Sequence, residues 1–340
     1  MKILIDAFGG DHSPEEVIAG TIEAVKERND FEAVLIGKEE VIVELLKGYE
    51  YDKSRVSIIN APDVITCEEE PTVAIKRKPD SSICVAFKEL KENPEAGAFV
   101  SAGSTGAVLV GATLKLGRIQ GINRPALCPI MPTLIEGKKV LLCDSGANAD
   151  CKSINLVQFA LMATAYAEAL GIKDPKVGLL SNGTEDKKGN MLNHEVFPML
   201  KNLKGINFVG NIEGRDILMG EVDVVVTDGF AGNIAVKSIE GAVKTVMKVM
   251  KNNMMASLSG KIGGLLLKKT FKKMMKEFDY NNHGGALFLG VKKAVIKAHG
   301  SSKRSAIKAG VLQAAEYATF DISDKITAKL ELNQPVEAAE

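Results

Sequence analysis

The sequence predicts an α/β protein built as three layers, with helices on both faces of a mixed, mostly parallel sheet. Three observations lead to this prediction. Short apolar runs rich in β-branched residues recur along the chain, most of them end in a glycine-rich or polar loop, and helical patterns separate them. Strands that are apolar without interruption are buried on both faces, as in a parallel sheet covered by helices.

The predicted strands and helices alternate along the chain. The strands are expected, in order, at Ile3–Ile5, Ala33–Ile36, Val56–Ile59, Ala98–Val100, Val140–Leu142, Val177–Leu180, Phe208–Val209 and Val222–Val226. The clearest helices are expected at Pro14–Glu27, Ser153–Leu170 and Asn233–Met250. Ser13 is a suitable N-cap for the first of these helices, because proline follows it at the first helical position.

One segment breaks the alternation and makes the predicted sheet mixed. Ala126–Pro132 and Lys139–Leu142 flank the turn residues Glu136 and Gly137. This pattern predicts an antiparallel hairpin or arm. The sequence contains neither repeats nor a low-complexity linker. We therefore expect residues 1–340 to form one continuous unit.

Composition narrows the functional classes. The chain has 43 basic and 43 acidic side chains and a net charge of zero, which does not favour a nucleic-acid partner. Its five cysteines are scattered without a C-x-x-C pair, as expected for free thiols in a reducing compartment. The first residues lack signal-peptide features, and no apolar run approaches the roughly 18 residues of a membrane span. We therefore expect a cytoplasmic protein.

The strongest local signal is a glycine-rich loop that follows a predicted strand and precedes an apolar helix. Its glycines would let backbone N–H groups approach an anion, its hydroxyls add donors, and the helix N-terminus favours negative charge. The candidate phosphate ligands are Ser101, Gly103, Ser104, Thr105 and Gly106. A capped strand-to-helix turn would explain the same residues. The sequence contains neither a Walker A loop nor a G-x-G-x-x-G fingerprint.

Two further loops, Asp144–Asn148 and Thr227–Asn233, each combine an acidic residue, a glycine and an asparagine. Asx turns and helix capping are the alternative explanation. Because ligands bind outside the carboxyl ends of strands in open α/β sheets, we expect these loops to lie near the first one. The four histidines lack metal-ligand spacing, and no Gly-x-Ser-x-Gly elbow occurs. We therefore expect neither a metal, nor a cofactor, nor a serine nucleophile.

A lysine- and methionine-rich segment, Lys244–Lys276, carries nine lysines and no acidic residue. Glycines at 260, 263 and 264 predict a bend between two helices, giving an amphipathic helical arm over residues 244–278. The arm residues expected to contact a membrane are Met254, Leu258, Leu265, Leu266 and Lys268. Lysines near an anionic surface contribute about 1 kcal/mol each. Two core helices with a lysine-coated face, or a docking surface for an acidic protein, would explain the same pattern.

Several long motifs occur in the order typical of one family. They run from Asp6–Asp11 through Ser101–Ala107, Asp144–Asn148, Asn207–Asp216 and Asp223–Asn233 to His299–Ser302. With these motifs the chain resembles the bacterial phosphate acyltransferases that use acyl carrier protein. The resemblance implies a fold similar to the isocitrate and isopropylmalate dehydrogenases and to phosphotransacetylase. It also implies a homodimer at the inner face of the cell membrane, in phospholipid synthesis, with a downstream acyltransferase as a further partner.

The resemblance implies that phosphate attacks an acyl thioester, so that the enzyme needs no nucleophile of its own. The enzyme must hold two anionic groups together and place donors at the developing oxyanion. Lys188, Arg215 and Lys237 are then candidate charge partners. Asn211 and Asn233 are candidate oxyanion donors. Asp228 is expected to orient a lysine, and His299 to protonate the leaving group.

Three other functions fit parts of the sequence. A dehydrogenase of the same fold would need an aspartate cluster for a metal and a nicotinamide site, and neither is recognised here. A phosphotransacetylase acting on coenzyme A thioesters would have no use for the lysine- and methionine-rich arm. A non-catalytic protein at the membrane surface would use the arm and not the loops. Detecting acyl phosphate as a product would eliminate the non-catalytic protein.

Overall fold

The structure, a computed structural model, describes residues 1–271 and 284–333 of the chain. Its strands are β1 (Lys2–Asp6), β2 (Glu32–Gly37), β3 (Val56–Asn60), β4 (Ala96–Ser101), β5 (Ala126–Cys128), β6 (Ile130–Pro132), β7 (Lys139–Cys143), β8 (Lys176–Ser181), β9 (Asn207–Glu213), β10 (Val224–Val226), β11 (Ala286–Leu289) and β12 (Ala294–Lys297). All the strands that the sequence predicts are therefore confirmed. β11 and β12 are additional.

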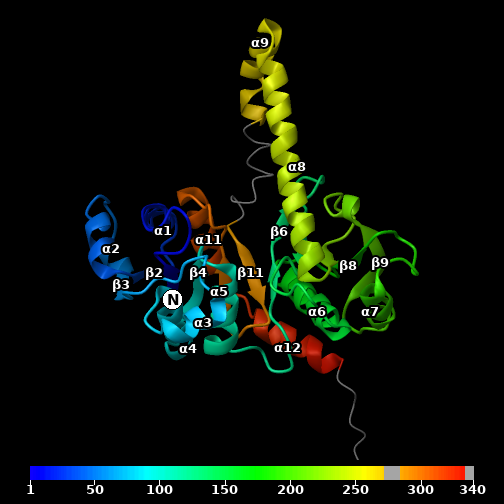
Figure 1. Ribbon diagram of the computed structural model, residues 1–340, viewed down its shortest axis with the longest axis horizontal. Helices are drawn as coiled ribbons and strands as arrows, with labels where there is room; N and C mark the ends of the chain where they lie inside the picture. The colour runs from blue at the N-terminus through cyan, green and yellow to red at the C-terminus, as the bar shows by residue number, and fades with distance from the viewer. Residues whose placement is uncertain (272–283, 334–340) are drawn as a thin grey trace, which may run out of the picture.

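The helices of the described ranges lie between these strands and cover them (Figure 1). They are α1 (Glu15–Glu27), α2 (Glu39–Leu46), α3 (Pro71–Arg77), α4 (Ser82–Glu92), α5 (Thr105–Gly111), α6 (Ser153–Ala169), α7 (Met191–Lys201), α8 (Gly229–Met255), α9 (Leu258–Leu266), α11 (Arg304–Tyr317) and α12 (Ile322–Leu332). Short helical turns η1 (Lys53–Arg55), η2 (Ala112–Leu116) and η3 (Gly214–Asp216) complete them.

The strands form two sheets, not the single sheet that the sequence suggests. The larger has the order β3-β2-β1-β4-β12-β11-β5 and the smaller has the order β6-β7-β10-β8-β9. Pairing is parallel except where β11 meets β12 and β5, and where β6 meets β7. In the larger sheet α1 and α11 cover one face and α4 covers the other. The predicted α/β class with a mixed, mostly parallel arrangement of strands is confirmed.

The predicted hairpin is right only in its second half. β6 pairs with β7 in antiparallel register, with Ile130 opposite Leu141. The segment before it is β5, which pairs instead with β11 in the larger sheet. Pro129 separates the two strands, and proline has no N–H to donate to a ladder, so strand pairing is interrupted there. The chain therefore passes from one sheet to the other at this residue.

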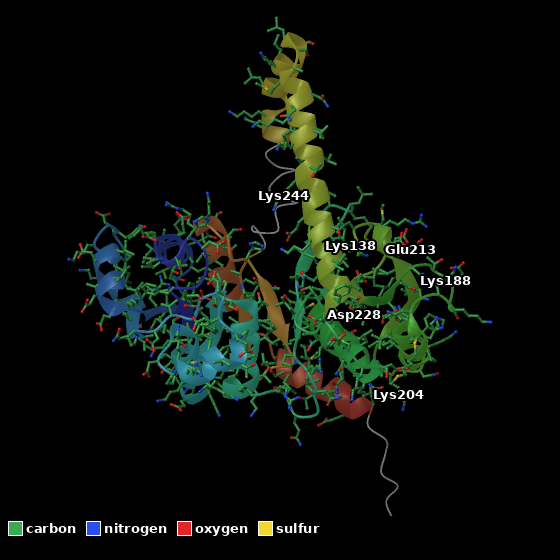
Figure 2. The ribbon with its side chains drawn as sticks, viewed as in Figure 1. Lys138, Lys188, Lys204, Glu213, Asp228 and Lys244 are labelled. Atoms are coloured by element: carbon green, nitrogen blue, oxygen red, sulfur yellow. The ribbon has the colours of Figure 1, made fainter. Side chains whose placement is uncertain are left out.

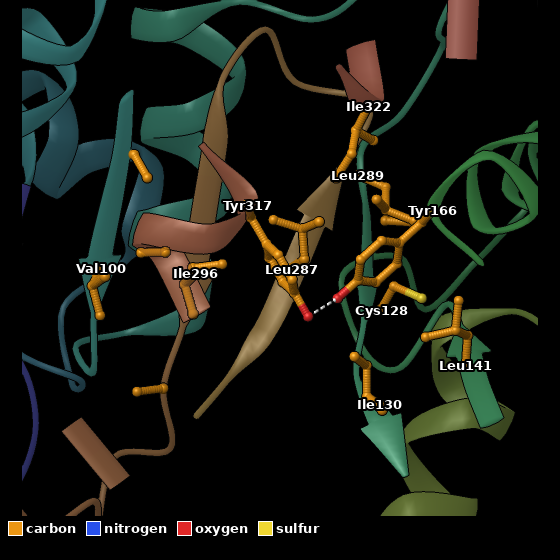
Figure 3. Close-up of a cluster of buried hydrophobic side chains, with 14 of the residues drawn as sticks. Val100, Cys128, Ile130, Leu141, Tyr166, Leu287, Leu289, Ile296, Tyr317 and Ile322 are labelled. Carbon is orange, nitrogen blue, oxygen red and sulfur yellow. Dashed lines mark hydrogen bonds between the residues drawn. The ribbon is translucent and has the colours of Figure 1, made fainter. Parts of the chain in front are cut away.

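One hydrophobic cluster spans both sheets and includes α6, whose sequence is apolar nearly throughout (Figure 3). Two buried tyrosines, Tyr166 and Tyr317, meet in this cluster, and their hydroxyls form a hydrogen bond of 2.6 Å. Gln313 Nε2 donates to the Tyr317 hydroxyl at 3.0 Å, which satisfies the remaining polar atom. The junction of the two sheets is therefore a packed, hydrogen-bonded core.

The N-cap predicted for the first helix is wrong. The N-cap of α1 is Pro14, which has no capping side chain. Ser13 Oγ donates instead to the carbonyl of Gly10 at 2.8 Å. The hydroxyl that was expected to cap the helix therefore forms a hydrogen bond within the loop after β1.

α8 and α9 project from the body as a helical hairpin (Figure 1). The turn between them is at Ala256 and Ser257, and Ser257 Oγ accepts a hydrogen bond from the N–H of Gly260. The predicted bend at the glycines is therefore wrong, since all three lie inside α9. A Cβ at Gly260 would lie 2.2 Å from the carbonyl oxygen of Met254, so this glycine permits close packing of the helices.

The described part of the arm carries exposed apolar side chains at its tip. The exposed fractions of Leu258, Leu265 and Leu266 are 76%, 71% and 78%. Met254 is half-buried, and its Sδ-methyl group packs toward Gly264. Beyond Val236, α8 and α9 contain no buried residue, so the alternative of two core helices is wrong for this part of the arm. Residues 272–278 of the predicted arm lie outside the described residues.

Candidate functional site

A cleft of about 330 Å³ lies between the two sheets, at the base of α8. The loop after β4 contributes Thr105, and the loop after β7 contributes Ser145. α8 contributes one face of its first turns, with Asn233, Lys237 and Glu240. The end of β12 and the loop that follows contribute Lys297 and His299. The three loops that the sequence singled out therefore converge on one cleft, together with a fourth that follows β12.

The glycine-rich loop after β4 is held by a buried carboxylate that the sequence did not identify as a site residue. Ser101 Oγ donates to Asp6 Oδ2 at 2.6 Å and accepts from the N–H of Gly103 at 3.0 Å. Asp6 is 2% exposed, and burial raises its pKa, while hydrogen bonds from Ser101 and from the N–H of Phe8 oppose that rise. The Ser101 hydroxyl is therefore engaged within the protein and fixes the loop.

Close backbone contacts explain the glycines of this region. A Cβ at Gly9 would lie 2.7 Å from the N atom of Gly103, so the loops after β1 and β4 touch. A Cβ at Gly106 would lie 2.6 Å from Pro71 Cγ, at the start of α3. Gly9 and Gly106 therefore allow close packing against neighbouring segments of the chain. Ser104 caps α5, accepting from the N–H of Ala107 at 3.4 Å.

The loop after β7 is organised by Asp144, whose side chain is fully buried. Its carboxylate accepts from the N–H groups of Leu127, Gly146, Ala147 and Asn148, and from the Asn148 side chain, at 2.7 to 3.3 Å. Burial raises the pKa of Asp144, and these hydrogen bonds oppose the rise. The carboxylate has no free acceptor direction toward the cleft, so its role is to hold Ser145 and Gly146 at the wall.

α8 begins in contact with this loop. Asp228 is the N-cap and accepts from the N–H of Ala231 at 2.7 Å. The orientation of a lysine by Asp228 stays a prediction. A Cβ at Gly232 would lie 1.9 Å from the carbonyl oxygen of Asp144, so only glycine allows the helix this close. That approach brings Asn233 against Gly146 and turns the side of α8 into a wall of the cleft.

Charged side chains gather at the mouth of the cleft. Lys237 Nζ lies 3.3 Å from His299 Nε2 and 3.2 Å from Glu240 Oε2. His299 Nδ1 lies 2.8 Å from Ser301 Oγ. Burial and the neighbouring Lys237 ammonium lower the pKa of His299, so the imidazole is neutral near pH 7. Sequence analysis named Lys237 and His299 separately, and the structure brings them together.

Lys297 also lines the cleft, and the sequence analysis missed it. It is the last residue of β12, beside Ser101 of β4, and it is 6% exposed. Its ammonium donates to the carbonyl of Ala298. Burial lowers its pKa to about 8. A lysine that ends an apolar run immediately before the His299–Ser302 motif was the signal that could have revealed it.

The remaining predicted residues lie on the smaller sheet or in the loops beside it, where Figure 2 labels Lys188. Lys188 is exposed in the loop after β8, and Arg215 is ion-paired with Glu213 beyond β9. Asn211 is buried, and its Nδ2 donates to the carbonyl of Glu185 at 2.8 Å. Among the described residues, these three side chains are not part of the cleft wall. Their roles in catalysis stay predictions.

Within residues 1–271 and 284–333, no group of three or more His, Cys, Asp or Glu side chains could hold a metal ion. Across the same residues, no helix is long and apolar enough to cross a membrane.

Comparisons with known proteins agree with this architecture. A family model described as "Fatty acid synthesis protein" matches residues 1–325. The chain is 49% identical over 332 residues to the phosphate acyltransferase of Clostridium novyi (strain NT), covering 97% of this chain and 99% of that protein. It is also 49% identical over 327 residues to the phosphate acyltransferase of Dictyoglomus thermophilum, covering 96% of each.

Solved structures share the fold at low sequence identity. EutD phosphotransacetylase from Staphylococcus aureus superposes with a TM-score of 0.60 at 17% identity, covering 94% of each chain. A 4-hydroxythreonine-4-phosphate dehydrogenase from Klebsiella pneumoniae gives a TM-score of 0.51 at 13% identity, covering 94% of this chain and 99% of that one. The expected likeness to phosphotransacetylase and to a dehydrogenase fold is confirmed for the architecture alone.

Proposed function

The chain belongs to the phosphate acyltransferase family, a family of transferases, and from that premise we propose that it transfers a fatty acyl group from acyl carrier protein to inorganic phosphate. The observation that carries the proposal is the charge of the cleft between the sheets. The described residues that line it include two lysines, Lys237 and Lys297, and a single carboxylate, Glu240, beside the neutral His299 imidazole. Such a surface attracts a small anion, and the cleft is bounded by hydrogen-bond donors.

The reaction needs no nucleophile from the protein. A phosphate oxygen attacks the thioester carbonyl carbon, a C–O bond forms, and the carbonyl oxygen becomes an oxyanion. The C–S bond then breaks, and the thiolate of the carrier leaves. Because a thiol has a pKa near 8.5, the thiolate leaves without a strong acid to protonate it. Positioning and electrostatic stabilisation are the protein's contributions.

The residues of the cleft suit these tasks. Asn233, next to Gly146 on α8, has an amide that can donate to the oxyanion. Thr105, at the start of α5, can donate a hydroxyl to phosphate. Ser145 Oγ donates to the carbonyl of Leu127 at 3.0 Å, so it is not activated by a base. His299, neutral near pH 7, is suited to accept a proton from phosphate, in place of the leaving-group role first expected of it.

The composition of the arm supports a role for the protein at a membrane surface. Leucines with exposed fractions above 70% cluster at its tip, and lysines occur along both helices. We propose that the tip inserts into an anionic lipid surface, which would place the enzyme at the inner face of the membrane. Acyl phosphate would then pass to a downstream acyltransferase, and the enzyme would act as a homodimer, as in the family it resembles.

Two acyl donors, a thioester of acyl carrier protein and a thioester of coenzyme A, distinguish the proposed function from its alternative. The solved phosphotransacetylases share the fold, which favours a coenzyme A thioester as the alternative donor. We expect the purified protein to have a kcat/KM at least tenfold higher with a long-chain acyl–acyl carrier protein than with the same acyl chain on coenzyme A. An equal or higher value with coenzyme A would refute carrier specificity and leave acyl transfer to phosphate intact.

Membrane binding has its own test. The double substitution Leu265→Asp and Leu266→Asp should abolish co-sedimentation with phosphatidylglycerol vesicles. Leu134→Asp is the matched control, because Leu134 is 75% exposed and lies on the body of the protein. If the control and the double variant sediment equally, the arm is not the lipid-binding element.

A further inference from the structure

Lys297 holds the most buried ammonium group of the cleft. Its side chain lies at the junction of β12 with β4, where the backbone of Lys297 is in register with Ser101. The residue is 6% exposed, whereas the side chain of Lys237 across the cleft is 52% exposed. The Lys237 ammonium is solvated and paired with Glu240, but the Lys297 ammonium is enclosed by protein. The two lysines therefore have different physical roles.

The protein leaves the Lys297 ammonium short of partners. An ammonium has three N–H donors. Among the described residues, Lys297 Nζ makes one hydrogen bond, to the carbonyl of Ala298, and no carboxylate lies within ion-pair distance. Cys67, Asp6 and Asp11 favour its charged form only from beyond hydrogen-bond distance, and Asp6 is already bonded to Ser101. Two donors of a buried cation thus remain for a ligand.

An unpaired buried charge is costly for a folded protein, and burial accordingly lowers the pKa of this lysine to about 8. The surrounding residues do not relieve the cost. The wall beside it includes the Thr105 hydroxyl and the His299 imidazole, which bring no negative charge. An anion in the cleft would provide both the missing charge and the missing acceptors.

We propose that Lys297 is the principal charge partner of the phosphate that enters this cleft, with Thr105 and His299 beside it. This inference rests on the proposed function for the identity of the anion. It moves the centre of phosphate binding from the glycine-rich loop, whose Ser101 hydroxyl is engaged with Asp6, to the end of β12. Lys237, exposed and paired, is left to act on the acyl donor or on the product.

Direct binding tests this proposal without requiring turnover. Inorganic phosphate is titrated into the full-length protein by isothermal calorimetry, with no acyl donor present. Lys297→Met should weaken phosphate binding about 10- to 100-fold, the effect of removing a hydrogen bond to a charged group. Lys293→Met is the control, because Lys293 is a half-buried lysine whose Nζ bonds to the carbonyls of Asn93 and Ala96 outside the cleft. Its phosphate affinity should stay unchanged.

The outcomes distinguish phosphate binding by Lys297 from the proposed acyl transfer to phosphate. If Lys297→Met keeps its wild-type unfolding temperature and binds phosphate within about twofold of the wild type, the inference is overturned. If phosphate binds through Lys297 and acyl phosphate never forms, the proposed function fails and the inference stands. In case the variant does not fold, phosphate should slow acetylation of Lys297 in the wild type, measured by peptide mass spectrometry against Lys293. Equal acetylation rates with and without phosphate would overturn the inference as well.

Discussion

Replacing Ser101 by alanine separates a structural from a ligand-binding role for the glycine-rich loop. In the folded protein the Ser101 hydroxyl joins the buried Asp6 carboxylate to the N–H of Gly103. Ser101→Ala removes a 2.6 Å hydrogen bond to a charged group, which is worth about 1.5–3 kcal/mol. It also leaves the N–H of Gly103 without its acceptor, which costs about 1–3 kcal/mol. We expect the free energy of unfolding to fall by about 2.5–6 kcal/mol in total.

Urea unfolding, followed by circular dichroism, measures the change. Ser54→Ala is the control, because Ser54 Oγ also donates to an aspartate at 2.6 Å, on Asp52, but both residues are exposed. That variant should lose much less stability, since water replaces the lost partner. The reasoning would be refuted if Ser101→Ala unfolded like the wild type while its KM for phosphate rose tenfold. Ser101 would then be a phosphate ligand, as the sequence alone suggested.

Three further predictions follow from the walls of the cleft. Gly232→Ala should lower the free energy of unfolding by about 1–3 kcal/mol through overpacking. Gly241→Ala, on the open side of the same helix, should raise it by about 0.5–1 kcal/mol. Equal free energies of unfolding for the two variants in urea melts would contradict this. The pKa of His299, followed by NMR, should lie below 6.5 and rise in Lys237→Met; an unchanged value would remove the lysine as a cause. Lys297 has a folded-state pKa of about 8 against 10.5 when unfolded, so the unfolded state binds more protons between these values. The buried charge of Lys297 therefore lowers the free energy of unfolding fully below about pH 8 and not at all above about pH 10.5. The stability advantage of Lys297→Met over the wild type should shrink by about 3 kcal/mol between these two pH values. A constant difference in stability would contradict the burial of the charge.

The sequence predicts the fold class and most of the strands because the strands are apolar and uninterrupted. It misses β11 and β12 because both are short and the second ends in a lysine, which breaks the apolar pattern. It places β5 in the hairpin because strand runs on both sides of Pro129 look alike. Which sheet a strand joins depends on long-range pairing, and that information is not present in local composition.

The sequence predicts several residues of the site, and it does not predict which of them meet in the cleft. Thr105 and Asn233 were named from loops after strands, Lys237 from its helical spacing to Asn233, and His299 from the family motif. The structure brings all four to one cleft. Lys188 was named by the same rule, since its loop also follows a strand. The strand order puts β8 and β9 beyond β10, on the side away from the larger sheet. Carboxyl ends of strands share an edge, but only the strand order tells which of them meet across the cleft.

The central claim is that phosphate itself attacks the thioester in this cleft. The most direct measurement is mass spectrometry of the products formed by the purified protein from a fatty acyl–acyl carrier protein and phosphate, together with the intact mass of the protein after exposure to the acyl donor alone. We expect acyl phosphate and free carrier thiol in equal amounts, and no acyl adduct on the protein. An acylated protein in the absence of phosphate, or free fatty acid as the only acyl product, would contradict the claim.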